Sequence, residues 1–451
     1  MRDAAPVTVV PRKRRGVELG LIIFALVLTL GAYVLVDINV TGELSASFPY
    51  LAGFSILLAV LAHIAVRWRL PYADPVILPC VILLNGLGLV MIHRIDLIND
   101  PPLNGARQQM IWTAVGVLMF ILVVTWLNDH RPLQRFTYTI GLAGIVLLLL
   151  PLVPGIGREV SGARVWIGVG DFVTFQPGEI AKIALAVFFA GYLVRNRDSL
   201  SMVGRKFLGM QFPRARDLGP LLVVWALSMA VIVFQRDLGT ALLYFGLFLV
   251  MLYVATSRIS WVVLGLSLFI GGALVASQTL DYVSNRFANW LDPFSPDRFD
   301  QEFGGSYQLV QGLFGLANGG LIGTGWGQGR PDITPVPQSD YIIASLGEEL
   351  GLAGIFAILA LYVLLVARGF RIGFAGQDDF GKLLGVGLAF VIALQVFIVV
   401  GGVTRVIPLT GLTTPFLAAG GSSLVANWII VALLLRLSDT VRNHPRLVID
   451  G

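Results

Sequence analysis

The chain has 451 residues, of which 56% are hydrophobic and 13% are charged, and its formal net charge is +5 at pH 7. Soluble domains carry about 25% charged residues, and no water-soluble fold could bury this much apolar surface. The composition therefore excludes a water-soluble enzyme and predicts an all-α polytopic membrane protein. The single cysteine, Cys80, excludes a disulfide framework and a thiol-based metal site.

Twelve runs along the chain are long and apolar enough for a membrane-spanning helix, which needs about 20 mostly apolar residues. They lie near 18–36, 49–66, 74–92, 108–127, 137–153, 177–194, 218–235, 237–255, 260–278, 340–367, 383–403 and 413–436. Arg236 and Asp237 separate two of these runs so closely that the chain must turn there almost without a loop.

The distribution of Lys and Arg predicts the orientation, because cytoplasmic loops carry an excess of these residues. With the N-terminus in the cytoplasm, 22 of the 32 Lys and Arg residues fall in cytoplasmic segments. An odd number of helices would place the C-terminal Arg442 and Arg446 outside. We therefore expect about twelve helices in the inner (plasma) membrane, a basic cytoplasmic N-terminus over 1–17 and a cytoplasmic tail over 438–451.

Two non-cytoplasmic stretches, 154–176 and 279–339, are candidates for function. Long loops inside a compact protein are usually functional or disordered. The aromatic content of 279–339 argues against disorder. We expect this large extracytoplasmic loop to fold back onto the membrane surface and cover a cavity; the alternative is a loosely ordered loop.

Charged residues within apolar spans are costly unless they are paired or hydrated, so they are functional candidates. Glu179 and Lys182 lie three residues apart, which lets them pair on one helix face. The alternative is a structural ion pair that fixes the helix register. Asp237 and Asp340 each begin a predicted span, where the helix dipole favours an acidic residue, so capping alone could explain both.

Glu348 and Glu349 lie two helical turns beyond Asp340. At about 100° per residue they point about 80° and about 180° away from Asp340, so the three carboxylates do not share one helix face. We expect the two glutamates to support neighbouring helices. No nucleotide-binding, zinc-protease or aspartate-rich metal motif occurs in the chain, and no nucleic-acid partner is expected.

Several short motifs occur together and in order along the chain. They are Gly162-Ala163-Arg164-Val165-Trp166-Ile167, Phe175-Gln176-Pro177-Gly178-Glu179-Ile180-Ala181-Lys182, Asp237-Leu238-Gly239-Thr240, Gly305-Ser306-Tyr307-Gln308, Ser339-Asp340-Tyr341-Ile342, Gly347-Glu348-Glu349-Leu350-Gly351 and Gly420-Gly421-Ser422-Ser423. This set resembles the SEDS family (shape, elongation, division and sporulation), which includes RodA and FtsW. The resemblance implies a ten-helix core over 74–437, preceded by an added N-terminal helix pair over 18–73. The motifs do not separate a RodA-type from an FtsW-type role, although the resemblance leans towards RodA.

The resemblance implies a peptidoglycan glycosyltransferase that polymerises lipid II into glycan strands on the outer face of the membrane. The family's catalytic aspartate corresponds to Asp340, and its cavity acid and lysine correspond to Glu179 and Lys182. The chain departs from the family pattern at three points. Val165 replaces a basic residue, Arg236 replaces a proline, and Ala418-Ala419 replace a Ser-Tyr pair.

The implied reaction needs a general base for the acceptor hydroxyl and cations for the leaving diphosphate. Asp340 is the predicted base, kept ionised by a helix N-terminus. The predicted substrate-binding cations are Arg164, Lys182, Arg330 and Arg405, together with the acid Glu179. No cofactor is required by the sequence, although a divalent cation could share the task.

Two other functions use a similar charged cavity. A flippase for lipid-linked precursors needs no general base, and a small-solute transporter should show inverted repeats, of which the sequence shows none that is convincing. A purely scaffolding role leaves the charged positions unexplained. The chain has no Ser-x-x-Lys set for cross-linking glycan. The resemblance accordingly implies a partner, a class B penicillin-binding protein with transpeptidase activity, besides lipid II and membrane lipids.

Overall fold

The computed structural model describes residues 7–9, 13–99, 104–160, 162–169, 173–201, 206–207, 210–211, 218–301, 304–443 and 446–448. Ten helices in this part of the chain are long and apolar enough to cross a membrane. They are α1 (Arg15–Thr41), α2 (Phe48–Arg69), α3 (Ile77–Ile98), α4 (Gly105–Trp126), α7 (Pro177–Ser201), α9 (Leu238–Thr256), α10 (Ile259–Thr279), α14 (Ile342–Phe374), α15 (Asp379–Val403) and α16 (Gly421–Arg442).

Two shorter apolar helices occupy the other two predicted spans. The helix α6 (Thr137–Leu149) continues into the 3-10 turn η1 (Leu150–Leu152), and α8 (Gly219–Ala230) continues into the π-helical turn η3 (Val231–Gln235). The predicted all-α polytopic fold is confirmed, and each predicted run overlaps one of these twelve helices. The number of spans stays a prediction, because these two helices are shorter than the other ten.

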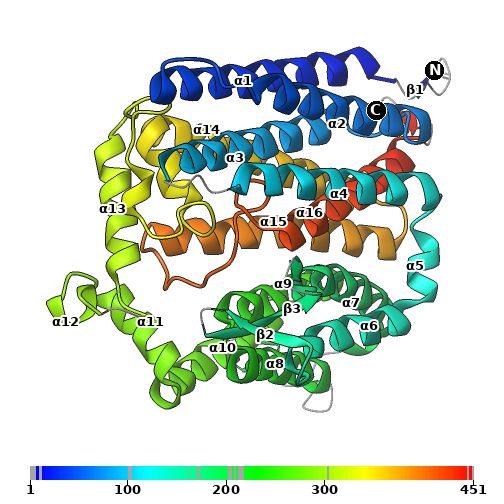
Figure 1. Ribbon diagram of the computed structural model, residues 1–451. Helices are drawn as coiled ribbons and strands as arrows, with labels where there is room; N and C mark the ends of the chain where they lie inside the picture. Colours follow the sequence, from blue (N-terminus) through cyan, green and yellow to red (C-terminus); the bar gives the residue numbers. More distant parts are fainter. Residues whose placement is uncertain are drawn as a thin grey trace, which may run out of the picture.

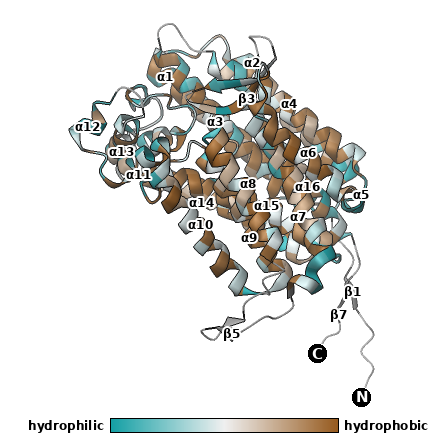
Figure 2. Ribbon diagram, turned by 90° about the horizontal axis from the view of Figure 1, so that it is seen from below, coloured by the Kyte–Doolittle hydropathy of each residue, from teal (hydrophilic) through white to brown (hydrophobic). Residues whose placement is uncertain are grey.

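The helices lie side by side in one bundle (Figure 1). The pair α1 and α2 forms one flank, α3, α4, α14, α15 and α16 form the middle, and α6 to α10 form the other flank. In an apolar 18-residue stretch of each helix, 72% of α15 and 89% of α16 is buried inside the protein, against 28% of α2 and 22% of α10. The centre of the protein therefore lies at α15 and α16, and the N-terminal pair is peripheral. Figure 2 shows that hydrophobic residues dominate these long helices.

The predicted large loop 279–339 carries three helices at one end of the bundle: α11 (Asp281–Leu291), α12 (Pro296–Phe299) and α13 (Tyr307–Gly319). It also contains the 3-10 turn η4 (Pro331–Ile333). Val283, Ser306 and Val310 are each at most 1% exposed. The loop is thus packed against the rest of the protein, as its aromatic content indicated.

The opposite end of the bundle carries both chain termini and α5 (Arg131–Arg135) (Figure 1). There β1 (Val7–Val9) pairs antiparallel with β7 (Arg446–Val448). The short strands β5 (Lys206–Phe207) and β6 (Met210–Gln211) also pair. A three-stranded antiparallel sheet of β2 (Gly157–Val160), β3 (Ala163–Val169) and β4 (Val173–Phe175) connects α6 to α7. The termini share one end, and the assignment of that end to the cytoplasm stays a prediction from the arginine distribution.

Helix α14 is broken at Gly351, whose φ of 67° lies in the left-handed region that glycine tolerates. The break frees backbone groups, and the end of the large loop pairs with them. Thr324 N donates to the Glu348 carbonyl (3.0 Å), and Leu352 N donates to the Gly320 carbonyl (2.9 Å). The first turns of α14 are therefore held by the loop that precedes them.

The span predicted at 413–436 begins later, at Gly421. Residues 404–420 form no helix, because Pro408 and Pro415 lack a backbone N–H and Gly411 adopts a φ of 80°. This re-entrant segment is nevertheless buried in its second half, with Thr414 1% and Leu417 0% exposed. Irregular backbone at this depth is tolerated where the protein itself satisfies its polar groups or where it lines a cavity.

Candidate active site

Asp340 lies in the turn that precedes α14, at the point where the large loop ends. It is half-buried and faces the re-entrant segment 404–420. A Cβ atom at Gly411 would lie 3.7 Å from Oδ2 of Asp340. The carboxylate and this glycine are therefore in close proximity, although 70 positions separate them in the sequence.

The guanidinium of Arg286, on α11, lies close to the same glycine, Gly411. A Cβ at Gly411 would be 3.9 Å from both terminal guanidinium nitrogens of Arg286, and Nη1 donates to the Leu409 carbonyl (2.9 Å). Arg286 and Asp340 form no ion pair among the described residues, so the cation and the carboxylate flank Gly411 without neutralising each other. Arg286 was not among the predicted site residues. Its only signal was a basic residue among the aromatic residues of a predicted surface segment.

The environment of Asp340 changes its proton affinity. Burial raises the pKa of Asp340 to about 6, the nearby Arg286 opposes that rise, and the nearby Asp237 adds to it. A carboxylate with this pKa is mostly ionised at neutral pH and is still able to accept a proton. The pKa of Asp340 therefore lies close to neutral pH, as a general base requires.

The expectation that Asp340 opens the helix is not met. Helix α14 begins at Ile342, and Tyr341 holds the N-cap position without a capping hydrogen bond from its side chain. We expected the N-terminus of a helix to favour the ionised form of Asp340. The positive group near its carboxylate is the guanidinium of Arg286. Asp237 does cap its helix, because its carboxylate accepts hydrogen bonds from Thr240 N (2.9 Å) and Thr240 Oγ1 (2.5 Å).

Several buried polar atoms in the two segments that meet at Asp340 have no hydrogen-bond partner among the described residues. They are Tyr341 Oη, Ser345 Oγ, Gln338 Oε1, Thr413 Oγ1 and Thr414 Oγ1. The two segments are joined by a hydrogen bond from Ala419 N to the Gln338 carbonyl (2.8 Å). Buried polar groups normally find partners. A substrate rich in hydroxyl and amide groups would supply them.

Glu179 and Lys182 form the ion pair that their spacing predicted, with Nζ of Lys182 2.5 Å from Oε2 of Glu179. Lys182 is 1% exposed, and Nζ also donates to Gln395 Oε1 (3.0 Å) and Asn427 Oδ1 (3.4 Å). Each of the three N–H donors of the Lys182 ammonium group can therefore have an acceptor. Gln395 in turn donates to the Thr413 carbonyl (2.9 Å), so the pair is linked to the re-entrant segment.

The three predicted substrate-binding arginines make no hydrogen bond or ion pair to Asp340 among the described residues. Arg164 on β3 is exposed and pairs with Glu159 at 2.9 Å. Arg330 is exposed and pairs with Asp332 at 3.0 Å. Arg405 Nε donates to the Trp290 carbonyl (2.7 Å), which ties the C-terminal end of α11 to the re-entrant segment.

Glu348 and Glu349 support neighbouring elements, as expected. Nε of Arg94 lies 2.9 Å from Oε1 of Glu349, and both side chains are buried. Glu348 Oε1 accepts hydrogen bonds from Arg330 N and Asn318 Nδ2, both at 3.0 Å. These contacts fix the large loop on α14 and so fix the turn that holds Asp340. Among the described residues no group of three or more His, Cys, Asp or Glu side chains could hold a metal ion.

Comparisons with known proteins agree on one family. Residues 75–443 match the cell cycle protein family of FtsW, RodA and SpoVE. The peptidoglycan glycosyltransferase RodA of Mycobacterium tuberculosis is 49% identical over 99% of the chain and 95% of that protein. A probable peptidoglycan glycosyltransferase FtsW of Geobacter metallireducens is 31% identical over 82% of the chain and 96% of that protein. A solved structure entitled structural coordination of polymerization and crosslinking by a peptidoglycan synthase complex aligns with a TM-score of 0.63 and 26% identity, over 82% of the chain and 98% of its own.

Proposed function

We propose that this chain, which belongs to the FtsW, RodA and SpoVE family, polymerises lipid II into glycan strands with Asp340 as the general base. The chain is a peptidoglycan glycosyltransferase, a reading carried by the 49% identity to RodA along nearly its whole length. The lower identity to FtsW, 31%, favours a role of the RodA type. A flippase is accordingly the less favoured function.

In the proposed reaction, the acceptor sugar hydroxyl attacks the anomeric carbon of the donor. The new carbon–oxygen bond forms as the bond between that carbon and the undecaprenyl diphosphate oxygen breaks. The hydroxyl proton passes to Asp340, and the electron pair of the broken bond leaves with the diphosphate. The geometry that supports this assignment is a half-buried carboxylate beside a cation that it does not neutralise.

Arg286 is the cation placed to stabilise the leaving diphosphate. Its Nη1 is anchored on the Leu409 carbonyl, and both terminal nitrogens approach Gly411. Arginine suits this task because its planar guanidinium binds phosphate oxygens in a bidentate manner. Arg164 and Arg330 are exposed, and in this proposal they exchange their acidic partners Glu159 and Asp332 for the anionic substrate.

Lys182 and Glu179 act on the site in this proposal through Gln395. Because Lys182 is fully hydrogen-bonded and buried, it holds Gln395, which holds the Thr413 carbonyl of the re-entrant segment. Arg405 holds the same segment against α11. Both contacts position Gly411 and the groups around Asp340. The prediction that these residues also touch substrate stays a prediction.

The protein is a multi-pass membrane protein, and we place both termini in the cytoplasm and Asp340 on the outer side. This placement brings Asp340 to the membrane boundary where the sugars of a lipid-linked substrate would lie. It rests on the excess of Lys and Arg at the end of the bundle that carries the termini.

A class B penicillin-binding protein is the proposed partner, since the related synthase complex coordinates polymerization with crosslinking. Apolar side chains are exposed on the large loop and on the part of α14 that it contacts: Leu321 (69%), Ile322 (83%), Leu352 (48%) and Phe356 (61%). The loop and the helix are joined there by the hydrogen bond from Leu352 N to Gly320 O. We propose that the partner docks on this surface, reorders the loop and opens the site.

The test of the function is polymerisation by the purified protein. Lipid II is the only substrate supplied, and the product is scored as glycan polymer by gel electrophoresis. The proposal expects polymer of many disaccharide units. A protein that moves lipid II across vesicles but makes no polymer, with or without the partner, would establish the flippase instead.

A further inference from the structure

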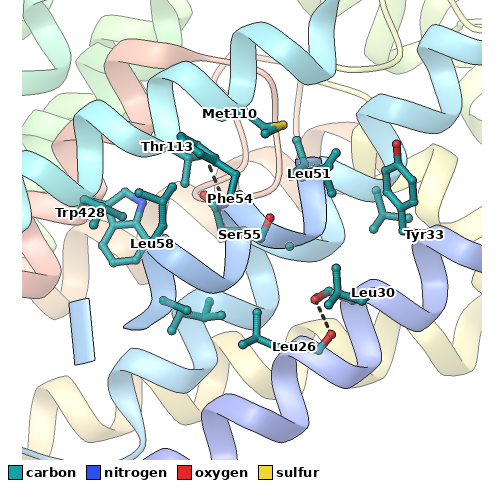
Figure 3. A pocket seen from close by; sticks show the side chains of 18 residues that line it. Leu26, Leu30, Tyr33, Leu51, Phe54, Ser55, Leu58, Met110, Thr113 and Trp428 are labelled. Carbon is teal, nitrogen blue, oxygen red and sulfur yellow. Dashed lines mark hydrogen bonds between the residues drawn. The ribbon is translucent and has the colours of Figure 1, made fainter. Parts of the chain in front are cut away.

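The N-terminal helices α1 and α2 lie outside the part of the chain that matches the family, because that match begins at residue 75. Most side chains at their junction with the bundle are apolar, such as Leu30 of α1, Leu58 of α2 and Met110 of α4 (Figure 3). This packing attaches the helix pair to the bundle. The C-terminal end of α1 has a further part, because it lies at the end of the bundle that carries the large loop and contacts that loop (Figure 1).

A buried polar contact holds the C-terminal end of α1 on α3. Asp37 is 0% exposed, and its Oδ1 lies 2.8 Å from Nε2 of His93. Nδ1 of His93 lies 3.3 Å from Oη of Tyr33, and the two rings stack with their centroids 4.2 Å apart. Oδ2 of Asp37 accepts a hydrogen bond from Ser45 N (2.9 Å), which fixes the turn after α1. The end of α1 therefore has a defined position on α3.

From this position α1 contacts the backbone of the large loop at Trp326 and Gly327. Nδ2 of Asn39 donates to the Trp326 carbonyl (2.7 Å), although 287 positions separate the two residues. Gly327 adopts a φ of 80°, and a Cβ there would lie 3.0 Å from Cβ of Asn39 and 3.1 Å from Cγ2 of Val40. Glycine suits this position because it tolerates the positive φ and has no Cβ. The loop backbone therefore lies directly against α1.

A buried ion pair holds the other side of the same segment, 326–329. Gly327 N donates to Oε2 of Glu349 (3.0 Å), and Oε1 of Glu349 lies 2.9 Å from Nε of Arg94. Nη2 of Arg94 donates to the Gly329 carbonyl (2.9 Å). The segment 326–329 thus connects α1 to Glu349, near the end of the first part of α14.

The first part of α14, residues 342–350, depends on contacts of this kind because the break at Gly351 interrupts the regular helix. Asp340 lies in the turn just before this part, and Glu349 lies close to its other end. A short helical segment moves as one body, so a displacement of Glu349 also displaces the turn that holds Asp340. The position of the carboxylate thus depends on the segment that α1 contacts.

We propose that Asn39 is a positioning residue for polymerisation: α1 holds the segment 326–329, that segment holds Glu349, and Glu349 fixes the part of α14 that follows Asp340. This role rests on the proposed function, since Asp340 is the proposed base. A displacement of about 1 Å is enough to lower the rate of a reaction between positioned groups by up to about 10²-fold. The N-terminal helix pair then helps to position a group that lies in the region matched to the family.

A pair of introduced cysteines tests this role, because it can connect the loop to α1 or release it. Asn39→Cys removes the donor, and the Cβ of Gly327→Cys would lie 3.0 Å from the Cβ at position 39. A shift of less than about 1 Å reaches the usual separation of a disulfide, about 3.8 Å. Cys80, the only cysteine of the unsubstituted chain, is buried. Initial polymerisation rates of the full-length double variant are measured over a range of lipid II concentrations, after reduction and after oxidation.

The reduced double variant should have a kcat roughly tenfold or more below that of the unsubstituted protein, with an unchanged KM for lipid II. The reason is that the base moves while the substrate-binding groups stay in place. Oxidation should restore most of the kcat, a dependence that a merely structural role would not produce. The matched control is Gly304→Cys in the same loop, with a φ of 74° and no described atom within 4 Å of its Cβ position. It should keep its kcat in both redox states.

A second set of variants keeps the proposal testable if the cysteine pair does not fold. Asn39 is exposed, so Asn39→Leu should fold, and its kcat should fall several-fold because the donor is lost. Asn39→Gln keeps an amide donor and should retain most of the kcat. Glu18→Gln, at the other end of α1, weakens the buried contact with Arg67 of α2 (3.1 Å). This control should lower thermal stability and leave the kcat unchanged.

Three results overturn the proposal: an equal kcat in both redox states of a fully cross-linked protein, a reduced form that is faster than the oxidised one, or an Asn39→Leu protein with the kcat of the unsubstituted protein. If the unsubstituted protein makes polymer and one of these results is found, only the role of Asn39 fails. If the unsubstituted protein makes no polymer from lipid II, the proposed function fails together with it.

Discussion

Nζ of Lys182 lies 2.5 Å from Oε2 of Glu179 and 3.0 Å from Oε1 of Gln395, and the Gln395 side-chain amide donates to the Thr413 carbonyl. A buried ion pair is thereby connected in two steps to the re-entrant segment that contacts Asp340. The pair fixes more than the register of one helix, because its loss would also release Gln395.

The first prediction concerns this network. Lys182→Ala leaves the Glu179 carboxylate buried and unpaired, which should lower the free energy of unfolding by about 3–5 kcal/mol. It should also abolish most polymerisation. Thermal unfolding in detergent and polymer yield from lipid II measure the two effects.

The charge exchange Glu179→Lys with Lys182→Glu separates packing from positioning. It should restore much of the thermal stability, because the pair is re-formed. It should not restore activity, because a carboxylate at 182 repels the Gln395 oxygen and the turned amide no longer holds Thr413. Recovery of both properties would mean that the pair serves the helix register alone.

The second prediction concerns Arg286. Arg286→Ala should lower the polymerisation rate by roughly 10²–10³-fold, the scale for the loss of a group that stabilises developing charge. The matched control is Arg298→Ala on α12 of the same loop, which should keep most of the activity. A variant at Arg286 with normal activity and normal folding would remove this residue from the site.

The third prediction is a pH dependence. Because a general base must be deprotonated, the rate should rise with pH through about 6, the raised pKa of Asp340, and then level off. Below that pH the rate should fall about tenfold per pH unit. Initial rates in a series of buffers at constant ionic strength measure the midpoint.

The arginine provides an internal check on this assignment. Arg286 lowers the pKa of Asp340, so the residual activity of Arg286→Ala should have its midpoint at a higher pH than the unsubstituted protein. A midpoint that does not move would indicate that the titrating group is not Asp340.

The fourth prediction concerns the partner surface. Ile322→Glu places a charge at the most exposed apolar position among the described residues of the loop, at 83% exposure, and should weaken docking of the transpeptidase. The rate of the isolated protein should stay the same, and the increase on adding the partner should be lost. Leu291→Glu, at an exposed apolar position of the same loop outside this surface (66%), is the control. Equal rates with and without partner in the unsubstituted protein would contradict activation.

Most of the architecture could be predicted from the sequence, because apolar runs and the distribution of arginines report on the membrane directly. The re-entrant segment was missed: residues 413–420 are as apolar as a span, and only Pro415 and the glycines distinguish them. The Glu179–Lys182 pair was found because it is local, at a spacing of three residues. Arg286 was missed because its relation to Asp340 depends on tertiary packing across more than 50 positions. The helix expected to begin at Asp340 begins at Ile342, because Asp340 and Tyr341 lie in a turn.

Polymer formation by Asp340→Asn tests whether Asp340 is the base of a lipid II polymerase. The amide keeps the size of the side chain and cannot take the proton, so the rate should fall by about 10²–10⁴-fold. Membrane insertion and thermal stability should be unchanged. Asp292→Asn, an exposed position of the same loop, is the control and should keep full activity. A well-folded Asp340→Asn protein that makes polymer at the rate of the unsubstituted protein would show that Asp340 is not the base.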